Sequence, residues 1–224
     1  FKASKTLGRE VLLDNSIFEL GEAFDSKKFA NYIEELEPTY YVVPDVLEDG
    51  FKTRSSFHKF CLTYGDLPGL KIGVVQGKTY QELVDCYKYM SDNADYIAIS
   101  FDYSWYKSIA ATKLNQYGPV DTLEKQCKGR QRFISMLQED KIWNYDKPHH
   151  LLGCSLAKEF KHYTQEKSIR SLDTSNPVVA GILNKRYYKD IGLLDKPSGL
   201  LADLINADLN KDQVAFLGSF KHTD

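Results

Sequence analysis

The chain has 224 residues, of which 42% are hydrophobic and 13% aromatic, and its formal net charge is −2. This composition excludes a disordered or collagen-like chain, and about 200–250 residues is a common size for a single-domain α/β barrel. The net charge disfavours a protein that binds nucleic acid by electrostatic attraction alone, because such domains carry a large excess of positive charge. We therefore expect one domain over residues 1–224, in which any nucleic-acid role depends on a local basic face and a shaped site.

The hydropathy and the first residues of the chain bear on its cellular location. No apolar run approaches the roughly 18–20 residues that a membrane span needs, so we expect a soluble protein in the cytoplasm. The chain opens FKASKTLGRE, without an initiator Met and without the apolar core of a signal peptide. We expect part of the native N-terminus to precede Phe1.

The four cysteines are Cys61, Cys86, Cys127 and Cys154, and they form no CxxC or CxC pair. Local zinc sites use such close spacing, so this pattern argues against a metal centre. We expect four reduced, partly buried thiols, as is usual in the cytosol.

Short apolar runs alternate with longer amphipathic stretches. The runs are rich in β-branched or aliphatic residues and bounded by polar, Gly or Pro residues, which predicts strands. These predicted strands cover residues 10–14, 40–43, 71–75, 96–100, 150–154 and 168–172. Helical spacing of apolar residues predicts helices over residues 26–37, 80–90, 123–138 and 177–184, with Thr79 as N-cap of the second.

This alternation, with strands that are apolar throughout, predicts a parallel sheet covered by helices. A doubly wound sheet is the competing architecture, but it would show a Gly-rich turn after an early strand, and LLDNSIFELG lacks one. We therefore predict a compact (β/α)8 barrel of the TIM type without a zinc subdomain. Two more strands are needed; one can precede Phe1, and residues 213–217 (QVAFL) are a weak candidate for the other.

Residues 101–123 form the least regular stretch, with aromatic residues gathered at Tyr103, Trp105 and Tyr106. A long loop after a barrel strand lies on the catalytic face, where such loops act as lids or substrate grips. We expect this stretch to be such a loop.

Polar residues follow the predicted strands. They are Asp14, Asp45, Gln76, Asp102, the Gly153-Cys154-Ser155 turn and Asp173. In a parallel barrel the carboxyl ends of all strands meet at one mouth, so these groups converge. Any single aspartate there can instead cap the next helix. Four aspartates at four strand ends, taken together, favour a functional site.

Two carboxylates in one mouth can divide the labour of glycosyl transfer. One stays ionised and attacks an anomeric carbon, while the other moves protons. A glutamine and a third carboxylate suit the donor and acceptor edges of a planar heterocycle. Motifs of other chemistries, such as GxSxG, HExxH and Walker loops, do not occur. We expect His149-His150 to be a surface or turn pair rather than a metal site.

Five fragments resemble, in order, the motifs of the tRNA-guanine transglycosylase superfamily. They are LLDNSIFELG, VVPDV, IGVVQGKTYQEL, HLLGCSL and SLDTSNP, within residues 11–180. They look most like its phage branch, the DNA 7-deazaguanine transglycosylases. The most specific fragment is GVVQG-x-x-Y-x-x-L. The resemblance implies a (β/α)8 barrel that exchanges guanine in a polynucleotide for a 7-deazaguanine base, without a metal or redox cofactor.

The resemblance also implies roles for residues. Asp14 matches the family's acid/base aspartate, and Asp173 matches its nucleophile. The substrate-binding set is Asp45 and Gln76 at the base edge, Gly153, Cys154 and Ser155 in the turn beneath the base, and Asp102 at the fourth strand end.

Two departures from the family pattern bear on the substrate. Ser16-Ile17 and Gly153-Cys154 each stand where the family usually has Gly-Gly, and the clustered cysteines and histidine of its zinc module are absent from the sequence. The second departure disfavours a tRNA substrate and favours a minimal enzyme that acts on DNA.

Contact with DNA would require the target guanine to be flipped out or single-stranded. Tyr103, Trp105 and Tyr106 can stack on bases or wedge the duplex, or can instead pack as lid residues on the barrel. The basic residues Lys125, Lys128, Arg130 and Arg132 can contact phosphates, or can form a solvated helix face. Both alternatives stay open at this point.

The function expected from the sequence is base exchange in DNA, with 7-cyano-7-deazaguanine as the incoming base and a covalent glycosyl-aspartate intermediate. The partners are then guanine-containing DNA and the free base. Two alternatives remain: an RNA-acting enzyme of the tRNA-guanine type with a separate subunit for RNA, and an inactive barrel that binds a nucleobase or nucleic acid.

Overall fold

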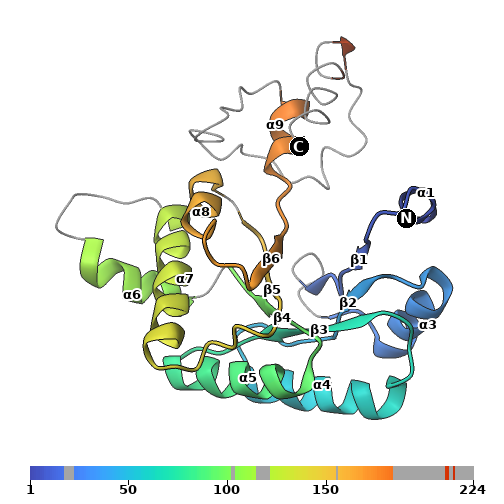
Figure 1. Cartoon of the computed structure of the whole chain (residues 1–224), viewed down its shortest axis with the longest axis horizontal. Coiled ribbons are helices and arrows are strands. Elements are labelled where there is room, and N and C mark those ends of the chain that lie inside the picture. Colours follow the sequence, from blue (N-terminus) through green and yellow to red (C-terminus); the bar gives the residue numbers. More distant parts are fainter. Residues whose placement is uncertain are drawn as a thin grey trace.

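The computed structural model describes residues 1–17, 23–101, 104–114, 122–154 and 156–183, together with residues 210, 211 and 214. Six parallel strands form one sheet in the order β1-β2-β3-β4-β5-β6, so that neighbours in sequence are neighbours in space (Figure 1). The strands are β1 (Leu12–Leu13), β2 (Tyr40–Val42), β3 (Leu70–Val75), β4 (Tyr96–Ile99), β5 (His149–Leu151) and β6 (Ile169–Leu172).

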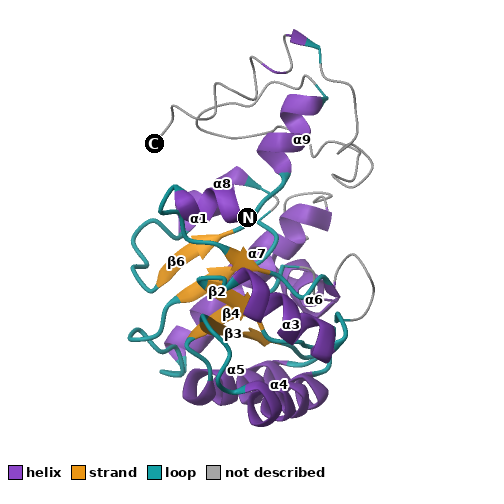
Figure 2. Cartoon of the chain, turned by 90° about the vertical axis from the view of Figure 1, so that its right-hand side faces the viewer, coloured by secondary structure: helices purple, strands orange, loops and turns teal. Residues whose placement is uncertain are grey.

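The described chain also contains eight helices, of which α3 to α8 lie between strands, while α1 precedes β1 and α9 follows β6. They are α1 (Lys2–Thr6), α3 (Ser26–Leu36), α4 (Gly50–Tyr64), α5 (Tyr80–Asn93), α6 (Ser104–Leu114), α7 (Thr122–Glu139), α8 (Ala157–His162) and α9 (Asn176–Ile182). Figure 2 shows α4 and α5 beneath β3 and β4. Within the described ranges, none of these helices combines the length and the apolarity that crossing a bilayer requires.

Each of the six predicted strands overlaps an observed strand, and the four predicted helices are confirmed as α3, α5, α7 and α9. Thr79 caps α5 as expected, because its side chain accepts a hydrogen bond from the Glu82 N–H. Asp25 and Asp49 cap α3 and α4 in the same way. Local capping and apolar periodicity were therefore sufficient to locate most elements.

The prediction of a closed eight-stranded barrel is wrong for the chain as described. The sheet is an open half-barrel whose edge strands are β1 and β6. Closure requires two further strands between these edges. The candidate strand at residues 213–217 lies outside the described residues, apart from Val214. The strand order also argues against a doubly wound sheet, because it runs one way without the reversal that puts helices on both faces.

The stretch 101–123 is not one long loop, because residues 104–114 form α6. This helix packs against α7 at Gly129, where a Cβ atom would collide with the backbone and side chain of Tyr106. Tyr106 is fully buried there. The prediction of a long loop failed because α6 packs closely on Gly129 of α7. The local periodicity of residues 101–123 does not reveal this contact.

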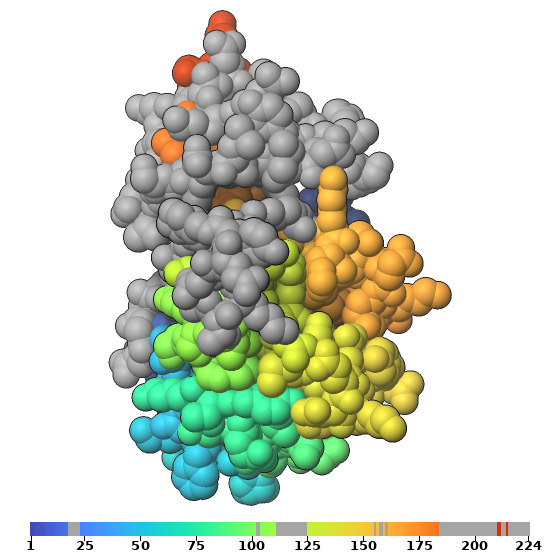
Figure 3. Space-filling model, turned by 90° about the vertical axis from the view of Figure 1, so that its left-hand side faces the viewer, coloured from blue at the N-terminus to red at the C-terminus, as the bar shows by residue number. Residues whose placement is uncertain are grey.

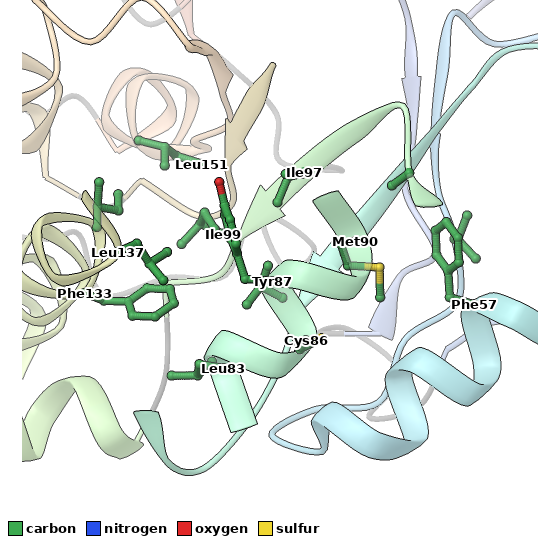
Figure 4. Packing of buried hydrophobic residues seen from close by; sticks show 14 of the residues in the cluster. Phe57, Leu83, Cys86, Tyr87, Met90, Ile97, Ile99, Phe133, Leu137 and Leu151 are labelled. Carbon is green, nitrogen blue, oxygen red and sulfur yellow. The ribbon is translucent and has the colours of Figure 1, made fainter. Parts of the chain in front are cut away.

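The core lies in two layers, one on each face of the sheet. On the outer face, Leu83 and Tyr87 of α5 meet Ile99 of β4, with Phe133 of α7 beside them (Figure 4). On the inner face a smaller cluster is formed by Val42, Ile72, Val74, Tyr96 and Ala98. Because both faces of the central strands are buried, their sequences are apolar throughout rather than alternating.

The prediction of a surface or turn pair at His149-His150 is also wrong, since both side chains are buried on β5. The ring of His149 stacks on Trp143 with ring centroids 3.8 Å apart, and its Nε2 lies 2.8 Å from the Tyr87 hydroxyl. Its Nδ1 has no hydrogen-bond partner among the described residues. Burial therefore lowers the pKa of His149 to about 4, which keeps the ring neutral near pH 7.

His149 should make the fold sensitive to acid. The unfolded chain takes up a proton near pH 6.5, whereas the folded protein does so only near pH 4, so the free energy of unfolding falls as pH drops between these values. The loss attributable to His149 should reach about 3 kcal/mol. His149→Phe keeps a flat ring between its neighbours but removes the titration.

Urea denaturation of both proteins between pH 8 and pH 4 measures this difference. The free energy of unfolding of the variant relative to the native protein should rise as pH falls. The difference at pH 8, where His149 is neutral in both states, is the reference. Parallel pH profiles for the two proteins would contradict the assignment.

Candidate active site

The concave face of the half-barrel holds a cavity of about 930 Å³. Its wall includes Asp14, which follows β1, and Asp173, which follows β6. Tyr40 and Tyr96 line it between these edges, with their rings 5.5 Å apart in an edge-to-face arrangement. The two carboxylates that the sequence singled out therefore reach one cavity from opposite edges of the sheet, which are labelled β1 and β6 in Figure 1.

Asp173 is held through one of its carboxylate oxygens. Its Oδ1 accepts hydrogen bonds from Nε2 of His150 at 3.1 Å and from the Gly153 N–H at 2.9 Å. Gly153 has a φ of +61°, a backbone conformation that glycine adopts without strain. The side chain of Asp173 is still 55% exposed.

The surroundings of Asp173 favour its charged form. Partial burial raises the pKa of its carboxyl group, but the hydrogen bonds from His150 and Gly153 lower it, as do the charge interactions with the His150 ring and with Arg130. The net effect is a pKa below the ordinary value. Asp173 is therefore an ionised carboxylate at neutral pH, as a nucleophile must be.

Asp14 lies at the exposed end of β1. Its Oδ2 accepts a hydrogen bond from the Ser16 N–H at 3.2 Å. Ser16 has a φ of +57°, in the left-handed region that glycine occupies at least cost.

Asp45 and Gln76 form a buried cluster with Asn15. Asp45 is 3% exposed; its Oδ1 accepts from Nδ2 of Asn15 at 2.7 Å and its Oδ2 from Nε2 of Gln76 at 2.6 Å. The Oε1 atom of Gln76 in turn accepts from the Glu48 N–H at 2.8 Å. Burial raises the pKa of Asp45, although both hydrogen bonds lower it.

Asp45 and Gln76 are not among the residues that line the cavity, and the predicted contact of these two residues with a base stays a prediction. The cluster ties together the carboxyl ends of β1, β2 and β3. Asn15 is the member that sequence reasoning missed, although it directly follows Asp14. Its hydrogen bond to Asp45 anchors the backbone next to Asp14.

Arg130 is buried and does not join the predicted phosphate-binding cluster. Its guanidinium group forms a bidentate pair with Glu159 at 2.7 and 2.9 Å, and both side chains are 0% exposed. It also donates to the Leu152 carbonyl at 2.5 Å and to Sγ of Cys154 at 2.9 Å. Burial raises the pKa of the Cys154 thiol to about 12 despite Arg130, so the thiol stays protonated. Arg130 thus braces the turn that contains Gly153.

Three other basic residues predicted to contact nucleic acid lie on α7, which belongs to the yellow-green region of Figure 3. Lys125 is half-buried, Lys128 is exposed, and Arg132 pairs with Glu139 at 2.6 Å. Trp105 is half-buried and stacks on Tyr80, as a packed lid residue does. None of these residues lines the cavity.

Three predicted site residues, Asp102, Tyr103 and Ser155, lie outside the described residues. Sequence reasoning also missed His150 as a partner of Asp173. The alternation of a strand would have placed His150 on the same face as Leu152. Its contact with Asp173, however, depends on the register between β5 and β6.

Comparison with known proteins adds no assignment: no protein-family model matches the chain, and no curated protein matches it. The site must therefore be interpreted from its own geometry.

Two Arg–Glu pairs, one buried and one exposed, test how much the buried pair stabilises the protein. Glu159→Gln leaves the fully buried Arg130 without a counter-charge, which should cost about 3–5 kcal/mol of stability. Glu139→Gln removes the exposed partner of Arg132 and should cost less than about 1 kcal/mol. Urea denaturation at pH 7 measures both. Equal effects in the two variants would show that the buried pair does not brace the fold.

Proposed function

We propose that the protein is a base-exchange transglycosylase that replaces guanine in DNA with a 7-deazaguanine base, most simply 7-cyano-7-deazaguanine. One observation carries the proposal. Asp14 and Asp173 follow the first and last strands of the sheet, yet both line the same cavity. Glycosyl transfer through a covalent intermediate requires such a pair of carboxylates, one to attack and one to transfer protons.

The environments of the two carboxylates support separate roles. Asp173, whose pKa is lowered, is the nucleophile: it attacks C1′ of a deoxyguanosine, the glycosidic bond breaks, and guanine leaves with a proton supplied by Asp14. Asp14 then takes a proton from the incoming 7-deazaguanine. The nitrogen of that base attacks C1′, and the Asp173 carboxylate is released. The reaction exchanges one base for another and needs no oxidant or reductant.

The cavity suits this substrate in size and in surface. Its volume of about 930 Å³ lies at the upper end of the range for small-molecule sites, which allows both a base and part of a sugar. The rings of Tyr40 and Tyr96 offer an aromatic wall to a flipped base. In this proposal the cluster of Asn15, Asp45 and Gln76 positions the end of β1, and with it Asp14. The proposed site of action is the cytoplasm, which would be that of the host cell if a phage encodes the protein.

Incubation with radiolabelled guanine or 7-cyano-7-deazaguanine, together with either DNA or tRNA, tests the proposal. Label in DNA supports it, whereas label in tRNA would favour the RNA-acting alternative. Binding of the base without incorporation into either acceptor would favour an inactive binding barrel.

Substitution of the two aspartates should block different steps of the reaction. Asp173→Asn lacks the attacking carboxylate and should form no covalent adduct with guanine-containing DNA. Asp14→Asn keeps the nucleophile but loses proton transfer, and adduct formation should slow by about 10²–10⁴-fold. Denaturing gels after long incubation measure the adduct.

Asp146→Asn is the control, because Asp146 lies on the opposite rim of the cavity, before β5, and has no proposed part in the reaction. Its rate should equal that of the native protein. Adduct formation by Asp173→Asn, with none by Asp14→Asn, would mean that the two roles are exchanged.

A further inference from the structure

Four side chains on the cavity wall form one continuous hydrogen-bonded chain. The Tyr96 hydroxyl of β4 lies 2.9 Å from Oγ of Ser171 on β6, which lies 2.8 Å from Nδ1 of His150 on β5. Nε2 of the same imidazole lies 3.1 Å from Oδ1 of Asp173. All four residues line the cavity, and neither Tyr96 nor His150 is more than 6% exposed.

The direction of this chain follows from what each group can donate. The Asp173 carboxylate is ionised and can only accept, so Nε2 of His150 carries a hydrogen. In the neutral imidazole with hydrogen on Nε2, Nδ1 accepts from the Ser171 hydroxyl, whose oxygen is left to accept from the Tyr96 hydroxyl. Burial raises the pKa of Tyr96, although Ser171 lowers it, so Tyr96 keeps its proton. In that form every hydrogen in the chain points towards Asp173.

The chain acts on only one oxygen of Asp173. His150 and the Gly153 N–H both donate to Oδ1, and no donor among the described residues reaches Oδ2. An oxygen that accepts two hydrogen bonds is the weaker nucleophile, because its electron pairs are already engaged. We propose that His150, oriented by Ser171 and Tyr96, is the positioning residue of the nucleophile, and that Oδ2 of Asp173 is the attacking oxygen. This inference rests on the proposed function.

An irregularity in the sheet makes the chain possible. His149 pairs with Ile169, but His150 pairs with Ser171, so Arg170 is an extra residue in β6 at this point. In a regular parallel pairing, Arg170 rather than Ser171 would stand opposite His150. A bulge of this kind re-aims side chains next to active sites. Here it brings the Ser171 hydroxyl within reach of the imidazole and places Asp173 one residue beyond the end of the strand.

The same residues invite comparison with a Ser-His-Asp hydrolase, in which serine would be the nucleophile. In such triads the carboxylate is buried and orients the histidine. Here the carboxylate is 55% exposed in the cavity, which departs from that arrangement, although Ser171 is exposed as well. The backbone N–H of Gly153, a natural oxyanion donor, is also already bound to Asp173.

The first arm of the test does not depend on catalysis. The chain has five histidines, and a protein labelled with ¹⁵N-histidine would report each imidazole by long-range ¹H–¹⁵N correlation at pH 7. The His150 signal, identified by its loss in His150→Phe, should show hydrogen on Nε2 and a hydrogen bond at Nδ1. Ser171→Ala should shift the Nδ1 resonance. Hydrogen on Nδ1 with a bare Nε2 would overturn the inference.

The second arm measures base exchange. His150→Gln keeps an N–H donor for Asp173 and should retain kcat within about tenfold of the native value, whereas His150→Phe keeps a ring without a donor and should lose about 100-fold in kcat. KM for the incoming base should change much less than kcat in both, and thermal melts confirm folding. His58→Phe, at an exposed position on α4, is the control and should match the native protein. Native kcat in a folded His150→Phe would overturn the inference.

The two arms separate failure of the inference from failure of the proposed function. If the native protein exchanges no base but the imidazole signals are as expected, the proposed function fails and the hydrogen-bonded chain stands. Labelling of Ser171 by a fluorophosphonate probe, abolished in His150→Phe, would replace Asp173 by Ser171 as the nucleophile. If Ser171→Ala changes neither the signals nor kcat, the orienting role of Ser171 is wrong.

Discussion

The sequential order of the parallel strands is the constraint on which the rest of the molecule depends. Each connection must return the chain to the start of the next strand, and right-handed crossovers that all run the same way put their helices on one face. That face is buried by α3, α4, α5 and α7, and the opposite face curves into a cavity. Every strand also ends on the same rim, so residues far apart in sequence, such as Asp14 and Asp173, reach one space.

Buried polar clusters stabilise this rim at two places. Asn15, Asp45 and Gln76 satisfy one another where β1, β2 and β3 end, and the Arg130–Glu159 pair braces the turn after β5. Buried polar groups are tolerable only when they are hydrogen-bonded, because an unpaired one costs its full desolvation energy. In both clusters this requirement is met by partners from different elements. The positions of the two cavity aspartates therefore depend on side chains that do not reach the cavity.

Local signals in the sequence located the elements well. Thr79 was recognised as a cap because its hydroxyl needs only the N–H three residues ahead, and the apolar runs of β3 and β4 were recognised as buried strands. Relations between distant elements were not predictable in this way. The packing of α6 on α7 requires Gly129 to meet Tyr106, and the burial of Arg130 requires Glu159 to lie within reach. The sequence alone presents Arg130 as one of four basic residues on a helix.

The sequence by itself determined a parallel α/β arrangement, the succession of most strands and helices, and the presence of carboxylates at strand ends, because periodicity, capping and strand polarity are local properties. Only the tertiary structure decided that the sheet of the described residues is open, that Asp45 and Gln76 bind each other beneath the rim, and that His150 meets Asp173. These outcomes depend on strand register and on competition for hydrogen-bond partners. An extra residue at Arg170 shifts β6 against β5 and changes which side chain faces the imidazole, and nothing in the local sequence of β6 signals that shift.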